Sequence, residues 1–299
     1  MAKKGMKAKK ASKKKVYNLI ECAYPDIRDW LKETDIVMIP FGSCEQHGLH
    51  IPVGCDSIEA WLATTMAAPK ANVPYTPWIW MGYSPQHLRG PNEGMGTITL
   101  RATTLQNVLY EVGRSLIHHG FNKLVYVMGH TSLMKVTDPV MRQIRYDTGA
   151  FVSIFRADSE GTQFIPEVAK ILESPPEETP GWHGGELETS ACFLYNEDLV
   201  HLDRYKDKEF THAPKWLSKK FSKNNGDPYV VFKNYRGYQI PMDHHEYSDT
   251  GMVGNCFRGS KEKGRKIFEI ISDYLADFLK EIKPLKVRAK NREFIERAF

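Results

Sequence analysis

The sequence has no hydrophobic run of membrane-spanning length. Its longest apolar stretches fall well short of the roughly 20 residues that a transmembrane helix needs. The start also lacks the apolar segment of a secretory signal. These absences argue against a membrane protein, and we expect a cytoplasmic protein with no membrane partner.

Cysteine is scarce, and its placement excludes a disulfide scaffold. There are five cysteines, an odd number, and none forms a CxxC pair. Widely scattered thiols of this kind are typical of reduced cysteines in a cytoplasmic protein. They also provide no thiolate cluster for a purely structural zinc site. The cysteines are Cys22, Cys44, Cys55, Cys192 and Cys256.

Acidic residues are absent from residues 1–15, which contain eight lysines. Without these lysines the formal charge of +5 becomes −3, so the remaining chain is mildly acidic. We predict a disordered lysine-rich tail over residues 1–15 and a single domain over residues 16–299. A tail that recruits nucleic acid to a non-catalytic binding protein is the alternative, but a solvated arm is favoured, and we expect no nucleic-acid partner.

Three short apolar runs predict buried strands over 36–41, 124–128 and 151–155. Apolar runs without alternation are typical of a parallel sheet that is covered on both faces. Helical spacing predicts helices between and after these strands, over 57–68, 104–119, 136–147 and 260–282. The fold class is therefore α/β, with a mainly parallel central sheet and helices on both faces. Residues 81–97 and 205–255 fit no regular element and resemble binding loops or lids.

Metal-ligating side chains follow these predicted strands, where α/β sheets bind ligands. Glu45 and His47 share one side of an extended segment, and Asp56 at a helix start is placed to bridge two ions. His130 follows the second strand, and HGGE at 183–186 opens a helix. Mixed carboxylate and imidazole ligands suit Zn²⁺, Mn²⁺ or Fe²⁺. Each motif alone also fits a surface pair, a loop histidine or a helix cap.

Taken together, these motifs closely resemble those of the creatininase (creatinine amidohydrolase) family. The resemblance spans about residues 35–280 in matching order and spacing, and its EQHG…GxD and HxGExETS blocks are specific. The matching segments are PFGSCEQHGLHIPVGCD at 40–56, GMGTITL at 94–100, Gly120-Phe121, VMGH at 127–130, HGGELETS at 183–190, TGMVG at 250–254 and EKG at 262–264.

The resemblance implies a layered α/β fold and a site in which two divalent ions activate a bridging water. Asp56 would bridge the ions, and Glu186 would serve both as a ligand and in catalysis, with Glu188 as the fallback. The full ligand set implied in this way is Glu45, His47, Asp56, His130 and Glu186.

The family pattern also bears on the reaction and the assembly. Members that hydrolyse creatinine take a glutamate ligand two residues after the second-strand histidine, but this chain has Ser132 there, which argues against creatinine. His183 matches the position of a proton shuttle to the leaving group. The family further implies a homo-oligomer, either a hexamer or a dimer-based assembly.

The substrate is expected to be a small, polar, cyclic molecule. Many donors and few apolar groups occur in the loops over 86–93 and 243–247, which suits a sugar-like ring. The chain is similar to the branch that opens a diketo-inositol (3-dehydro-scyllo-inosose) by C–C hydrolysis, in which the second ketone absorbs the carbanion. An amidohydrolase acting on a cyclic amide or formamide is the alternative. The expected substrate-binding residues are Gln86, His87, Arg89, Thr131 and Trp182.

Overall fold

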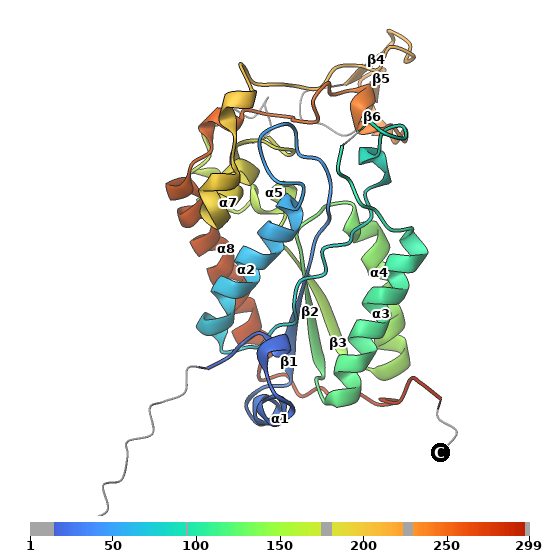
Figure 1. Cartoon of the computed structure of the whole chain (residues 1–299). Coiled ribbons are helices and arrows are strands. Elements are labelled where there is room, and N and C mark those ends of the chain that lie inside the picture. The colour runs from blue at the N-terminus through green and yellow to red at the C-terminus, as the bar shows by residue number, and fades with distance from the viewer. Residues whose placement is uncertain (1–14, 94, 175–180, 224–229, 297–299) are drawn as a thin grey trace, which may run out of the picture.

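The computed structural model describes residues 15–93, 95–174, 181–223 and 230–296 (Figure 1). All but Lys15 of the predicted lysine-rich tail lies outside the described residues. The strands are β1 Ile36–Phe41, β2 Lys123–Met128, β3 Phe151–Arg156, β4 Phe221–Lys223, β5 Val230–Phe232 and β6 Tyr235–Tyr238. The α-helices are α1 Tyr24–Glu33, α2 Cys55–Ala71, α3 Ala102–His119, α4 Leu133–Thr148, α5 Ser159–Thr162, α6 Pro166–Ala169, α7 Glu186–Asn196 and α8 Lys261–Ile282. Short 3-10 helices include η1 Leu19–Glu21, η2 Pro85–His87, η4 Glu197–Leu199, η5 Leu202–Arg204, η6 His244–Glu246 and η7 Cys256–Arg258.

A parallel sheet in the order β1-β2-β3 forms the centre of the fold. Ile36 pairs with Lys123, and Lys123 pairs with Phe151, so the three strands start and end level with one another. All six residues of β1 and of β2 are buried, as expected for strands that are covered on both faces. The three strands predicted from the apolar runs are confirmed, with β2 and β3 each one residue longer than predicted.

Helices cover both faces of this sheet (Figure 1). Because side chains alternate along a strand, Ile36 and Met38 pack into one apolar cluster with α2, α7 and α8. Val37 and Ile39 point the other way and pack into a second cluster with α3 and α4. The layered α/β fold with a parallel sheet between helices is therefore confirmed.

Three of the four predicted helices extend slightly beyond their predicted bounds, and α8 begins one residue later than predicted. The predicted helix over 57–68 is α2, which begins two residues earlier and ends three residues later. α3 ends where predicted, and Gly120 after it has a φ of 124°, a backbone conformation that favours glycine. Among the described helices, none is long and apolar enough to cross a membrane.

The predicted absence of regular structure over 205–255 is wrong. This stretch contains a small antiparallel sheet in the order β4-β5-β6, held partly by the stacked rings of Phe221 and Phe232, 4.8 Å apart. The strands have only three or four residues each, too few to give a clear alternation. The sheet lies beyond the end of β1–β3 at which the carboxyl termini of the strands meet (Figure 1).

The cysteines are free thiols, as predicted. Cys55 on α2 and Cys192 on α7 lie side by side, with 3.6 Å between their sulfur atoms. Burial raises the pKa of the Cys55 thiol well above its ordinary value, and the thiol therefore acts as apolar packing between the two helices.

Candidate metal centre

Buried carboxylates and imidazoles converge beyond the carboxyl ends of β1 and β2. Four of them stand where the sequence predicted ligands, after the two strands and in the first turn of α2. The fifth is in the first turn of α7, which brings its carboxylate to the same point. The five residues are Glu45, His47, Asp56, His130 and Glu188, and all are buried.

Glu45, Asp56 and His130 form one potential ligand group, with ligand atoms within 4.8 Å of one another. Glu45 Oε2 lies 3.3 Å from His130 Nε2, and Asp56 Oδ2 lies 3.4 Å from His130 Nδ1. The Ser43 hydroxyl lies 2.8 Å from Glu45 Oε2 and 2.5 Å from Asp56 Oδ2. Since a hydroxyl has one proton, Ser43 can donate to only one of these carboxylates at a time.

A glycine permits the close approach of β2 to α2 that this group requires. A Cβ atom at position 129 would overlap the carbonyl oxygen of Asp56. Gly129 therefore lets the residue after it, His130, reach the first turn of α2.

His47, Asp56 and Glu188 surround a second position. His47 Nδ1 lies 3.0 Å from the carbonyl oxygen of Glu45, to which it donates, so the Nε2 lone pair is directed elsewhere. That Nε2 lies 3.2 Å from Asp56 Oδ1 and 3.8 Å from Glu188 Oε2. Two acceptors at 3.2 Å attract each other only through a cation or a proton between them.

The electrostatics of the centre reflect this crowding of acids and imidazoles. Burial alone would raise the pKa of Glu45, but the neighbouring His130 and His87 hold it well below its usual range. Burial opposes the charged form of His47, yet Asp56 and Glu188 raise its pKa well above the ordinary value. Burial raises the pKa of Glu188 to about 7.

The donor set fits two divalent ions. Asp56 presents Oδ2 to the group with Glu45 and His130, and Oδ1 to the group with His47 and Glu188. Nitrogen and carboxylate oxygen donors in this ratio suit Zn²⁺, Mn²⁺ or Fe²⁺. A shared carboxylate between two such groups is the arrangement expected of a bridged pair of ions.

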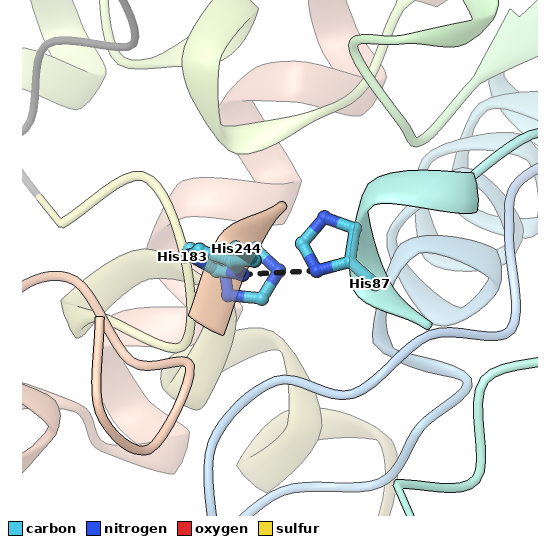
Figure 2. A group of neighbouring side chains, drawn as sticks. All are labelled: His87, His183 and His244. Carbon is cyan, nitrogen blue, oxygen red and sulfur yellow. Dashed lines mark hydrogen bonds between the residues drawn. The ribbon is translucent and has the colours of Figure 1, made fainter. Parts of the chain in front are cut away.

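Three further histidines, His87, His183 and His244, lie together beside the centre, and Figure 2 shows how they are arranged relative to one another. His183 stacks between His47 and His87, with ring centroids 4.2 and 4.7 Å apart, and His244 lies perpendicular to both His87 and His183. Gln46 Nε2 lies 3.3 Å from His87 Nδ1 and 3.0 Å from His244 Nδ1, and ties the loop after β1 to the two later segments.

His183 has its two ring nitrogens in different settings. Nδ1 lies 2.5 Å from the carbonyl oxygen of Gly251, to which it donates, and Nε2 lies 3.2 Å from Glu45 Oε1. Burial, together with the charge of His47, lowers the pKa of His183. A neutral imidazole held in this way has Nε2 available to take up a proton beside the ligand groups.

A cavity of about 740 Å³ opens over the centre, with Glu45, Asp56, His130 and Glu188 in its wall. Four of the predicted substrate-binding residues also line it, namely Gln86, His87, Thr131 and Trp182. Arg89 is not among the described residues of the lining. Its Nη2 instead donates to the carbonyl oxygen of Asp249 at 3.1 Å, which removes this predicted contact.

The structure does not bring Glu186, the predicted fifth ligand, to the centre. Its carboxylate accepts from the backbone amides of Glu173 and Ser174 at 2.8–3.0 Å and forms an ion pair with Lys263. Two residues correspond to about 200° of rotation on a helix, so Glu186 and Glu188 face opposite ways on α7. Glu188, the alternative fifth ligand, is the glutamate of α7 that faces the centre.

Sequence reasoning did not identify several polar residues of the centre. Ser43 lies within the matched segment, but nothing in its type distinguishes it from other loop serines. Glu59 is about one helical turn after Asp56, and this i, i+3 spacing indicates that the two side chains lie on the same face of the helix. Asp56, Glu59 and Glu188 have ligand atoms within 4.8 Å of one another.

Comparisons with known proteins identify the family and several relatives of this chain. The family model described as Creatininase: Creatinine amidohydrolase matches residues 20–279. A creatinine amidohydrolase from Pseudomonas putida is 29% identical over 255 residues, which cover 82% of this chain and 89% of that protein. A 3-dehydro-scyllo-inosose hydrolase from Thermotoga maritima is 26% identical over 263 residues, which cover 86% and 80%. A solved mutant creatininase of the Zn-Zn type superimposes with a TM-score of 0.68 at 26% identity, covering 90% and 99%.

Proposed function

The chain belongs to the creatininase family of hydrolases, and from this membership we propose that it opens a small, polar, cyclic substrate at a centre of two divalent ions. One observation carries the proposal. Asp56 belongs both to the ligand group with Glu45 and His130 and to the pair of carboxylates, Asp56 and Glu188, that flank His47 Nε2, and it lies in the wall of a 740 Å³ cavity. A structural metal site would be closed, whereas this one borders space for a substrate.

The ligands hold their positions through contacts outside the centre. The Glu45 carbonyl fixes the ring of His47, and Ser43 bridges Glu45 and Asp56. Two divalent ions bound here would supply Lewis acidity and lower the pKa of water toward neutrality. The mutant creatininase of the Zn-Zn type supports a pair of ions in this family.

His183 moves the proton in this proposal. Its Nδ1 is fixed by the Gly251 carbonyl, so the ring presents Nε2 in one orientation at the edge of the cavity. Nε2 takes the proton released when water attacks a substrate carbonyl and returns it to the leaving group. The lowered pKa of His183 favours the neutral ring that this first step requires.

We propose a diketo-inositol, 3-dehydro-scyllo-inosose, as the substrate. The cavity wall carries hydrogen-bonding side chains suited to ring hydroxyls, including Gln86, Thr131, Ser132 and Gln239. The Thermotoga maritima relative acts on this compound by name. Water would add its oxygen to one ketone carbon, and the adjacent C–C bond would break. The second ketone would take up the electron pair as an enolate, which the proton from His183 then quenches.

Cleavage of a C–N bond in a cyclic amide or formamide is the second candidate. It is supported by the 29% identity to a creatinine amidohydrolase. Water would again attack a carbonyl carbon, and the proton would go to a leaving nitrogen instead of a carbon.

Product analysis separates the two candidates. The metal-loaded protein is incubated with 3-dehydro-scyllo-inosose and, separately, with creatinine and formamides, and the products are followed by NMR. Ring opening of the diketone to a keto-sugar acid supports the first candidate. Turnover of an amide without ring opening of the diketone would overturn it in favour of the second.

A homo-oligomer, hexameric or dimer-based, and a cytoplasmic location remain proposals that rest on the family and the sequence. Sedimentation velocity of the purified protein tests the first, and a sedimentation coefficient of a monomer would contradict it.

A further inference from the structure

Glu59 is a fully buried acid whose carboxylate has no hydrogen-bond partner. It lies on α2 one turn after Asp56, its side chain is inaccessible to solvent, and neither oxygen accepts or donates a hydrogen bond among the described residues. Leaving a buried carboxyl group without a partner is unfavourable by several kcal/mol in order of magnitude. The fold therefore keeps this residue in a position that an apolar side chain would fill more favourably.

The neighbours of Glu59 indicate what its partner is. One oxygen of Glu59 lies within 4.8 Å of ligand atoms of both Asp56 and Glu188. These same two carboxylates flank His47 Nε2, at 3.2 and 3.8 Å. Three carboxylates at such spacing repel one another when ionised, and a cation between them relieves the repulsion.

We propose that Glu59 is a further ligand of the second ion, together with Asp56, Glu188 and His47, an inference that rests on the metal-dependent function proposed above. The ligand set of this ion is then three carboxylates and one imidazole, whereas the first ion has two carboxylates and one imidazole. Carboxylate-rich sets suit harder ions such as Mn²⁺ better than Zn²⁺. The second position is therefore selective for Mn²⁺ relative to the first.

The test compares metal binding by four forms of the full-length protein: wild type, Glu59→Gln, Asp56→Asn and Thr64→Val. Glu59→Gln keeps the shape of the side chain and removes its charge. Thr64 is the matched control, because it is also on α2, is fully buried and has a hydroxyl without a partner. Mn²⁺ stoichiometry and affinity are measured by titration calorimetry on metal-free protein.

Wild type is expected to bind two Mn²⁺, and Thr64→Val is expected to bind both with the affinities of the wild type. Glu59→Gln is expected to keep the first ion and to bind the second about 10-fold or more weakly. Wild-type affinity for both ions in Glu59→Gln, with loss of binding in Asp56→Asn, would overturn the role of Glu59 and leave the metal-dependent function standing. Unchanged binding in Asp56→Asn would instead overturn the proposed function itself.

A measurement on the wild type tests the same proposal without depending on whether a variant folds. In a crystal soaked with Mn²⁺, anomalous scattering locates the ions without any substitution. A Glu59 oxygen at about 2.2 Å from the second ion is the expected result. An ion coordinated by Asp56 and Glu188, with Glu59 outside ligand distance, would contradict the proposal.

Discussion

His47 Nε2 lies 3.2 Å from Asp56 Oδ1, while the other nitrogen of the same ring donates to the Glu45 carbonyl oxygen. The ring is therefore fixed with Nε2 directed at a carboxylate. The contact needs a positive charge between the two atoms, which a proton supplies in the metal-free protein and a bound metal ion would supply in its place.

The two glutamates of α7 should behave oppositely when changed to glutamine. Glu188→Gln removes a proposed ligand and is expected to lower the metal content. Glu186→Gln is expected to keep both ions but to reduce the free energy of unfolding by about 1–3 kcal/mol, because the ion pair of buried Glu186 with the partly buried Lys263 is lost. Elemental analysis and urea unfolding of both variants test this, and metal loss in Glu186→Gln would contradict the assignment.

His183→Gln is expected to slow the reaction while the ions stay bound. General acid–base catalysis contributes about 10²–10⁴-fold to a rate, so kcat should fall within that range. The metal content should remain that of the wild type, because His183 is assigned no ligand role. A variant that loses an ion together with its activity would show that His183 is a ligand and not the proton carrier.

The stability of the metal-free protein should depend on pH through Glu188. Burial raises the pKa of its carboxyl group in the folded protein from an ordinary 4.5 to about 7. Between these values the folded protein keeps a proton that the unfolded chain has lost, so stability falls as the pH rises through this range. His47, whose pKa is raised well above its ordinary value, adds a loss of stability in the same direction above about pH 6.5.

Urea unfolding of the metal-free protein at pH 5 and pH 8 measures this dependence. Wild type should be the less stable at pH 8, and Glu188→Gln should remove about 2 kcal/mol of the difference. An identical pH dependence in the two proteins would show that Glu188 does not titrate in this range.

Substrate affinity should depend on Gln86 and not on Arg89. Gln86 lines the cavity, whereas Arg89 donates to Asp249. Gln86→Leu should raise KM roughly 3- to 10-fold, the effect of one lost hydrogen bond. Arg89→Leu should leave KM unchanged, and steady-state kinetics on the opened substrate compares the two. The reverse pattern would mean that the loop over 86–93 is arranged differently when the substrate is bound.

The parallel sheet could be predicted because its strands are continuous apolar runs, a pattern that burial on both faces imposes. Glu45, His47, Asp56 and His130 could be placed at one edge because parallel strands end together. By contrast, the choice between Glu186 and Glu188 depends on how α7 is rotated about its axis, which its packing against α2 and α8 determines. The position of Glu188 could therefore not be read from residues 183–190 alone.

Metal content per chain, measured by elemental analysis on wild type and Asp56→Ala side by side, tests the central claim most directly. Asp56 is the one residue that both ligand groups share, so its loss should affect both ions. The account predicts close to two ions per wild-type chain and a sharp fall in the variant. One ion or none in wild type, unchanged by the substitution, would contradict the shared site and leave the family resemblance as evidence of fold alone.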